Sequence, residues 1–132
     1  MFVLTQRNTW VIFEVKASTS VSDTYIADIA VQRYVTEACG YQIENCFIMH
    51  LNKKCTYPNL SNIFTVENVT AEVNERWPDI YPFTAAFQDL LTEGEMPIVP
   101  IGKHCDTPYT CEFKEYCWKD VAEPSIFSIP YV

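Results

Sequence analysis

The sequence predicts an α/β fold, and three segments in its first half carry that prediction. Residues 10–16 alternate as a strand does, residues 23–39 carry apolar side chains at helical spacing, and residues 41–51 form a second strand-like run. A strand, a helix and a strand in this order favour a right-handed crossover and an α/β layer, with one more short strand at 63–66. The 132 residues, 48% hydrophobic, suffice for one domain with its own core.

The N-terminal segment reads as a β-hairpin. Residues 2–4 are a short apolar run, residues 5–9 are polar and turn-prone, and residues 10–16 form the second strand. Alternation along that strand places Glu14 and Lys16 on the same face. A carboxylate and an ammonium in this arrangement can bind a divalent cation and stabilise an attacking hydroxide or a phosphate oxygen, although the same pair is also common on a solvated strand.

A helix is expected after the second strand. Ser22 or Asp23 is a natural N-cap, and the helix should run to about Cys39, with Gly40 as its stop. Gln32 lies on or near the side of this helix that faces the sheet. Taken alone, a glutamine in that position more often hydrogen-bonds a nearby backbone group than it takes part in chemistry.

The next segment, residues 69–94, repeats apolar residues at helical spacing. Pro78 and Pro82 interrupt the pattern, which predicts one kinked helix or two short ones. Asn68 or Thr70 is the expected cap.

The charge balance limits the partners. The formal net charge is -8 with nine basic residues, so the surface as a whole repels nucleic acid and anionic membranes, and a polyanion must be gripped locally or through metal ions. The N-terminus does not read as a secretory signal, and no apolar run approaches the ~18 residues of a membrane span. These features predict a cytoplasmic protein without a membrane partner, in which six cysteines are free thiols or ligands.

Three cysteines stand out in the C-terminal tail. Cys105, Cys111 and Cys117 have five residues between neighbours, and thiolates so clustered favour zinc or an iron–sulfur cluster. The alternative is that they are free core thiols. Both metal centres usually take four ligands. Candidates for the fourth are His104, Cys39, Cys46, Cys55 and a residue ahead of Met1.

Two parts of the chain together resemble a known family. Glu14-Val15-Lys16 with the following Ala-Ser-Thr-Ser-Val, and Asp28-Ile-Ala-Val-Gln32, are similar to the core of RecB-like nucleases of the PD-(D/E)XK superfamily. The terminal Gly102-Lys-His-Cys, with Cys111-Glu-Phe and Tyr116-Cys117-Trp118, resembles the C-terminal cysteine box of iron–sulfur members of that group.

The resemblance implies a fold, an activity and cofactors. It implies a restriction-endonuclease-like core, a mixed sheet with flanking helices, over residues 1–101, a cysteine box over 102–120, and a tail over 121–132. The implied activity is metal-dependent hydrolysis of DNA with Mg²⁺ or Mn²⁺. The implied second cofactor is a 4Fe–4S cluster, with Zn²⁺ as the alternative.

The resemblance also implies roles for single residues. Glu14 would be a metal ligand, the Val15 carbonyl would complete the metal shell, and Lys16 would position or activate the attacking water. Gln32 would line the site and contact substrate or orient the lysine. The thiolates of Cys105, Cys111 and Cys117 would hold three corners of the cluster.

The sequence departs from the family pattern at three places. The family has an Asp on the strand before the Glu, and no acidic residue precedes Glu14 here. It also has an upstream helix and first cluster cysteine, so we expect Met1 to be an internal methionine of a longer frame, whose N-terminal part would be a partner of this chain. Many relatives carry a Tyr where Thr36 stands, with Tyr34 as a nearby substitute. Two alternatives therefore stay open, a noncatalytic module that binds nucleic acid or protein, and a small zinc- or disulfide-stabilised domain unrelated to nucleases.

Overall fold

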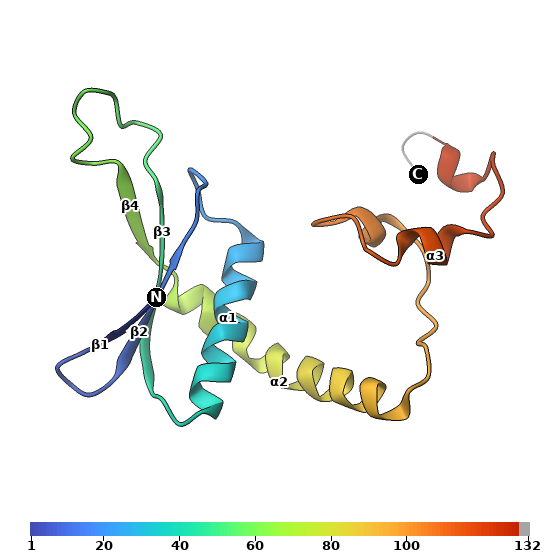
Figure 1. The fold of residues 1–132 in the computed structure, drawn as a ribbon, viewed down its shortest axis with the longest axis horizontal. Coiled ribbons are helices and arrows are strands. Elements are labelled where there is room, and N and C mark those ends of the chain that lie inside the picture. The colour runs from blue at the N-terminus through green and yellow to red at the C-terminus, as the bar shows by residue number, and fades with distance from the viewer. Residues whose placement is uncertain (130–132) are drawn as a thin grey trace. The chain divides into compact units, whose positions relative to one another are not determined.

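The computed structural model describes residues 1–129 (Figure 1). The chain divides between Glu95 and Met96 into two compact units. We call residues 1–95 the sheet unit and the described residues from Met96 onward the cysteine unit. Within the described residues, no helix combines the length and the apolar character needed to cross a bilayer.

The sheet unit contains a mixed four-stranded sheet in the order β1-β2-β3-β4. β1 (Phe2–Leu4) pairs antiparallel with β2 (Trp10–Val15), which confirms the predicted hairpin. β2 pairs parallel with β3 (Ile43–Leu51) after a crossover through helix α1 (Asp23–Ala38), and β4 (Phe64–Asn68) returns antiparallel to β3. The α/β class and the mixed sheet predicted from the sequence are therefore confirmed.

The limits of α1 agree with the predicted ones. Ser22 is the N-cap in extended backbone, and its carbonyl accepts the N–H groups of Tyr25 and Ile26. Cys39 is the C-cap, and Gly40 follows with φ of +88°, a left-handed conformation that glycine adopts without steric cost.

Helix α2 (Thr70–Glu93) is a single element that contains both Pro78 and Pro82 and stops at Gly94, where φ is +67°. The prediction of a single helix is therefore confirmed, and the alternative of two short helices is wrong.

The cap predicted for α2 is also wrong. The N-cap is Val69 and no side chain caps the helix, while Thr70 is its first residue. Asn68 still contributes, because its side-chain oxygen accepts the Thr70 N–H at 3.0 Å and the Thr70 hydroxyl at 2.6 Å. These two hydrogen bonds hold the turn from β4 into the helix. Asparagine side chains often stabilise such turns by bonding to nearby backbone groups.

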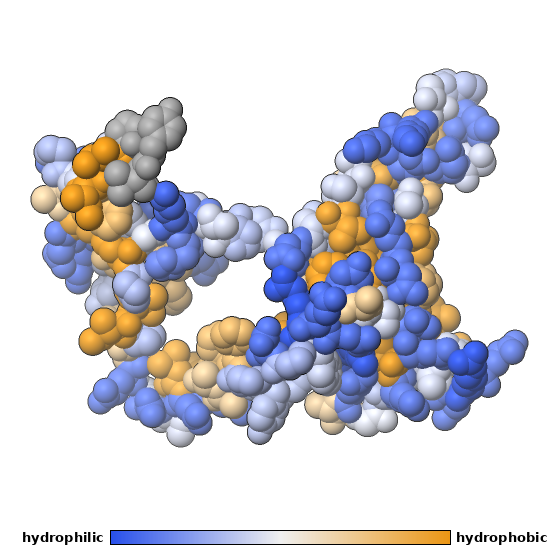
Figure 2. Space-filling view, turned by 180° about the vertical axis from the view of Figure 1, so that it is seen from behind, coloured by the Kyte–Doolittle hydropathy of each residue, from blue (hydrophilic) through white to orange (hydrophobic). Residues whose placement is uncertain are grey.

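The core lies between the helices and one face of the sheet. Its buried members alternate along β3, and on α1 Ile29 and Ala30 lie three and four residues after Ile26, as the periods of the two structures require. The fully buried members are Ile12, Cys46 and Ile48 from the sheet, and Ile29, Ala30 and Val73 from the helices. Figure 2 shows further apolar side chains gathered over the sheet unit, bordered by hydrophilic ones.

Polar contacts join the two helices beside this core. Arg33 of α1 donates to the side-chain oxygen of Asn74 on α2, and its guanidinium lies 5.1 Å from the Trp77 ring centroid. Arg76 of α2 pairs with Asp23 at the start of α1. The helices are thus connected at two points along their length, which fixes the face that α1 presents to the sheet.

The cysteine unit has little regular structure. It contains the 3₁₀ helices η1 (Lys103–Asp106) and η2 (Ile126–Ser128) and the short helix α3 (Lys114–Trp118). The Lys114 ammonium lies 2.7 Å from an Asp106 carboxylate oxygen, and the Trp118 ring packs 4.7 Å from that of Phe127. These contacts tie the ends of the unit to α3.

Candidate active site

A polar cluster forms where β2 ends beside α1, and we call it the β2–α1 cluster. Lys16 Nζ lies 2.9 Å from Glu14 Oε1 and 2.8 Å from Asp28 Oδ2. Gln32 Nε2 donates to the other Glu14 oxygen at 3.2 Å. The structure thus brings together Glu14, Lys16 and Gln32, the three residues proposed from the sequence for catalysis, and adds Asp28 to them.

Local periodicity places these side chains. Ile12 is fully buried and lies two residues before Glu14, so Glu14 points to the same helix-covered face and retains a side-chain exposure of only 20%. On α1, Asp28 and Gln32 are one turn apart, and the fully buried Ile29 fixes the orientation of the helix between them. Core packing therefore holds both halves of the cluster.

The cluster is charged at neutral pH. Burial acts to raise the pKa of Glu14, but hydrogen bonds from Lys16 and Gln32 and the positive charge of Lys16 outweigh it, and the net pKa is lowered from 4.5. Hydrogen bonds to Asp28 and then to Glu14 raise the pKa of Lys16. Glu14 is thus a carboxylate and Lys16 an ammonium throughout the physiological range.

Tyr25 is the tyrosine that reaches the cluster. The Lys16 ammonium lies 4.8 Å from the centroid of its ring, within range of a cation–π interaction. Tyr34, considered from the sequence as a substitute for a missing family tyrosine, packs instead on Trp77 of α2, with ring centroids 6.0 Å apart. Thr36, which stands at the family position, donates its hydroxyl to the Gln32 carbonyl at 2.6 Å.

Sequence reasoning assigned no role to Asp28 or Tyr25. A signal was present, because residues 25, 28 and 32 follow one another at spacings of three and four and share one stripe of the helix. Their contact with Lys16 depends on how α1 crosses β2, which the spacing alone does not give.

The donor set of the cluster suits a hard divalent cation. Mg²⁺ is commonly held by one or two carboxylates together with water and substrate phosphates. Glu14 and Asp28 supply two carboxylates, and Val15, whose side chain is 55% exposed, offers only its carbonyl oxygen. In the part of the chain that the structure describes, no three His, Cys, Asp or Glu side chains form a group able to hold a metal ion.

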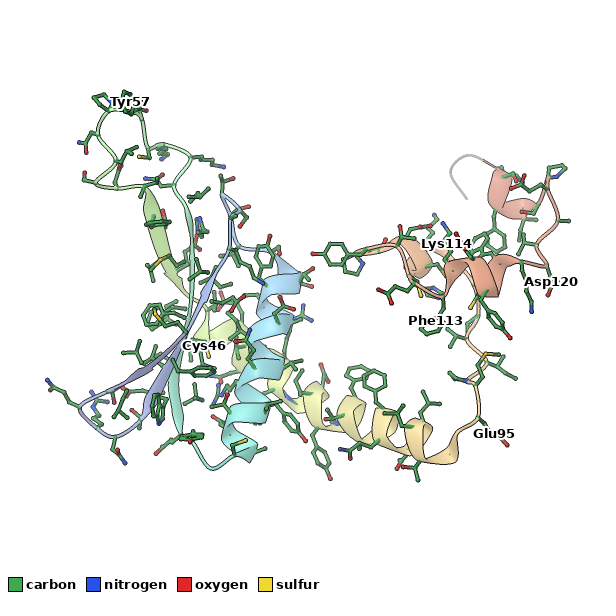
Figure 3. The ribbon with its side chains drawn as sticks, in the orientation of Figure 1. Cys46, Tyr57, Glu95, Phe113, Lys114 and Asp120 are labelled. Carbon is green, nitrogen blue, oxygen red and sulfur yellow. The ribbon has the colours of Figure 1, made fainter. Side chains whose placement is uncertain are left out.

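The three tail cysteines have different environments. Cys105 is buried in η1, while Cys111 and Cys117 are exposed. The Cys111 N–H donates to the Cys105 carbonyl at 2.8 Å, which brings these two residues together through the backbone. Their role as cluster ligands stays a prediction, as does that of His104. Cys46 belongs to the core of the sheet unit (Figure 3), and burial raises the pKa of its thiol to about 11.

A second polar pair lies next to the cluster. The buried His50 of β3 contacts Glu67 Oε1 of β4 through Nε2 at 2.7 Å and the Leu51 carbonyl through Nδ1 at 3.0 Å. These hydrogen bonds, the one to Glu67 first, outweigh burial and raise the pKa of His50. The Lys16 N–H donates to the Met49 carbonyl at 2.9 Å, which continues the parallel ladder and places Lys16 beside His50. The sequence analysis missed this histidine, although it occupies an inward position of an alternating strand.

Comparisons with protein-family models, with curated proteins and with solved structures find no match to this chain. The geometry of the β2–α1 cluster therefore carries the functional argument.

Proposed function

We propose that the chain is a metal-dependent DNA nuclease domain with a restriction-endonuclease-like core. One observation carries the proposal. Glu14, Lys16 and Gln32, which come from a strand and from a helix well separated in sequence, meet in one hydrogen-bonded cluster at the end of β2. The predicted resemblance to RecB-like nucleases names the same three residues.

Each residue has a definite task in this proposal. Glu14 and Asp28 bind the divalent cation, with the Val15 carbonyl as a further oxygen donor. Bound Mg²⁺ or Mn²⁺ supplies a Lewis acid that polarises a phosphoryl oxygen and lowers the pKa of water. When substrate binds, Lys16 gives up its contact with one carboxylate. Its ammonium then donates a hydrogen bond to a phosphate oxygen or to the attacking hydroxide.

Gln32 acts as a positioning residue. Its amide donates to Glu14 Oε2 and leaves Oε1 to Lys16, so the carboxylate keeps one orientation. The buried Ile29 holds the helix that carries it. A fixed carboxylate lowers the reorganisation needed when the cation and the phosphate enter the site.

A specific observation favours a second candidate, a noncatalytic module that binds nucleic acid. Lys16 already pairs with both carboxylates, at 2.9 and 2.8 Å, and residues 1–129 hold no group of three metal-ligating side chains. In that case the cluster is a structural ion pair, and its removal leaves DNA binding unchanged.

The test is DNA cleavage by the full chain. End-labelled single- and double-stranded DNA is incubated with Mg²⁺, Mn²⁺ or EDTA, using the wild type, Glu14→Gln, and Glu44→Gln as a matched control. Glu44 is also ion-paired, but with Arg7 and away from the cluster. We expect cleavage that EDTA abolishes, that Glu14→Gln reduces by roughly a hundredfold or more, and that Glu44→Gln preserves.

Other outcomes decide against the nuclease. Binding without cleavage, insensitive to Glu14→Gln, supports the noncatalytic module. Cleavage that persists in EDTA or in Glu14→Gln contradicts the assigned roles.

For the tail we propose a structural metal centre on Cys105, Cys111 and Cys117. The backbone hydrogen bond from Cys111 to Cys105, which brings two of the three cysteines together, supports this. Iron and zinc content measured by emission spectrometry distinguishes a 4Fe–4S cluster from Zn²⁺. Cys111→Ser should lower the bound metal, whereas Thr110→Ala, at the exposed neighbouring position, should not.

A further inference from the structure

The loop between β3 and β4, residues 52–63, leaves the sheet at the same end as the β2–α1 cluster (Figure 1). β2 and β3 are parallel, so the segments that follow them lie at one edge of the sheet. The Leu51 N–H donates to the Ser18 carbonyl at 2.8 Å, which ties the start of the loop to the segment just after Lys16. The base of the loop and the segment that follows Lys16 are therefore neighbours.

The loop carries the free positive charge of the sheet unit. Residues 1–95 contain six Lys and Arg residues, and four of them pair with carboxylates. The two that form no ion pair in this unit, Lys53 and Lys54, are neighbours and both are exposed. The paired ones are Arg7, Lys16, Arg33 and Arg76.

The sequence around the loop is free of opposing charge. No acidic residue occurs between Glu44 and Glu67, although the chain as a whole carries a net charge of -8. A polyanion repelled by the rest of the surface meets its least unfavourable potential here. Figure 2 shows this projecting loop as a hydrophilic segment.

The loop also presents an aromatic ring to solvent. Tyr57 is 83% exposed and lies at the far end of the loop (Figure 3). An exposed tyrosine in the same loop as unpaired lysines is a combination that binds single strands, in which cations track the phosphates and a ring stacks on a base. In a duplex the base faces are already stacked, so the ring selects unpaired nucleotides.

Side-chain hydrogen bonds give the loop a defined base. Asn52 Oδ1 accepts the Lys54 N–H at 3.0 Å, and Asn52 Nδ2 donates to the Asn62 carbonyl at 2.9 Å. The Asn52 N–H also donates to the Ile63 carbonyl at 2.8 Å. The two lysines are thus held at the first turn of a closed loop, which limits the conformational entropy lost when a strand binds.

We propose that this loop grips single-stranded nucleic acid, with Lys53 and Lys54 on consecutive phosphates and Tyr57 stacked on a base. The assignment deepens the proposed function and rests on it for the identity of the substrate. It names a binding element outside the β2–α1 cluster.

The test is equilibrium binding in EDTA, where cleavage does not interfere. Fluorescence anisotropy measures the Kd of the full chain for a labelled oligothymidylate of about 20 nucleotides, which exceeds the roughly 4–16 nucleotides that such grooves cover. The variants are the double Lys53→Ala/Lys54→Ala, Tyr57→Ala, Tyr57→Phe, and Lys119→Ala as a control lysine of the cysteine unit. All the substituted side chains are exposed, and circular dichroism and thermal melting verify that each variant is folded.

The expected results separate charge from stacking. The double variant should bind roughly tenfold more weakly and lower the slope of log K against log salt by about 1.4, because each single-strand phosphate contact contributes about 0.7. Tyr57→Ala should also lose roughly tenfold, and Tyr57→Phe, which keeps the ring, should remain within about twofold of the wild type. Lys119→Ala should bind as the wild type does.

Wild-type affinity in both the double variant and Tyr57→Ala overturns the proposal, as does an equal loss for a duplex of the same length. The two proposals fail separately. If Glu14→Gln abolishes cleavage while the loop variants bind and cleave normally, the loop assignment is wrong and the nuclease stands. If no cleavage occurs and the loop variants still lose binding, the loop assignment stands and the noncatalytic module is favoured.

Discussion

Lys16→Met is the substitution that tests the β2–α1 cluster most directly. It keeps much of the length of the side chain and removes the charge that lies 2.9 Å from Glu14 and 2.8 Å from Asp28. Partly exposed ion pairs contribute ~0.2–1 kcal/mol each, so the loss of two pairs should lower the free energy of unfolding by about 1 kcal/mol at neutral pH. The side-chain exposures of Lys16 and Glu14, 21% and 20%, place this pair toward the stronger part of that range.

The same substitution should raise the pKa of Glu14. Burial already acts in that direction, and in Lys16→Met only the hydrogen bond from Gln32 and the charge of the N-terminal ammonium still oppose it. Because the pKa of Glu14 in the folded wild type lies below 4.5, its stabilising contribution is complete above that pH and is lost as the pH falls through the lowered folded value. The stability difference between wild type and variant should therefore be full at neutral pH and shrink in acid.

Urea denaturation followed by circular dichroism over a series of pH values measures the difference, and carbon-detected NMR of the side-chain carboxyl group gives the pKa of Glu14. Lys53→Met is the matched control, since Lys53 pairs with no carboxylate of the sheet unit, and its stability should stay within about 0.5 kcal/mol of the wild type. An unchanged Glu14 pKa together with wild-type stability in Lys16→Met would refute the cluster geometry.

Three further predictions concern the sheet unit. Ile29→Ala empties a fully buried position of α1 and should cost about 2–5 kcal/mol in urea unfolding, whereas Val31→Ala, at a position 48% exposed, should change stability by less than about 0.5 kcal/mol; similar costs would contradict the helix orientation. His50 has a raised folded pKa, so its contribution is complete below the ordinary value of 6.5 and is lost as the pH rises through the folded pKa; unfolding measured across that window should show this loss, and Glu67→Gln should reduce it. Iodoacetamide should alkylate the exposed cysteines well before Cys46 at neutral pH, with the sites mapped by mass spectrometry and the difference abolished in urea; rapid native labelling of Cys46 would disagree with its burial.

Local pattern was enough to predict the β2–α1–β3 unit. Alternation in residues 10–16 placed Glu14 and Lys16 on one face of the strand, and the stop at Gly40 fixed the end of α1, because both signals depend on neighbours along the chain. Gln32 could be placed near the sheet for the same reason, and its hydrogen bond to Glu14 agrees with that placement.

Features that depend on tertiary contacts were not predictable in this way. Asp28 meets Lys16 only because α1 crosses β2 at the turn that follows Tyr25, and His50 has a carboxylate partner only because β4 brings Glu67 to its ring. Which of its two predicted forms α2 takes likewise depends on packing, because the fully buried Val73 before Pro78 and Ile80 after it contact the same core. Local propensity gives way wherever burial supplies more free energy than the propensity costs.

The parallel pairing of β2 and β3 explains why the proposed chemistry and the proposed binding loop are neighbours. In a strand–helix–strand unit both strands end at the same edge, so Lys16 after β2 and the loop after β3 emerge together. An antiparallel pairing would send Lys53 to the opposite edge, and a strand gripped there could not cross the carboxylates of Glu14 and Asp28. In the proposed function, a substrate phosphate approaching those carboxylates needs compensating positive charge, which a bound cation, Lys16 and the acid-free loop would supply. The negative charge of the rest of the surface then directs a polyanion to this edge, because it repels the polyanion elsewhere.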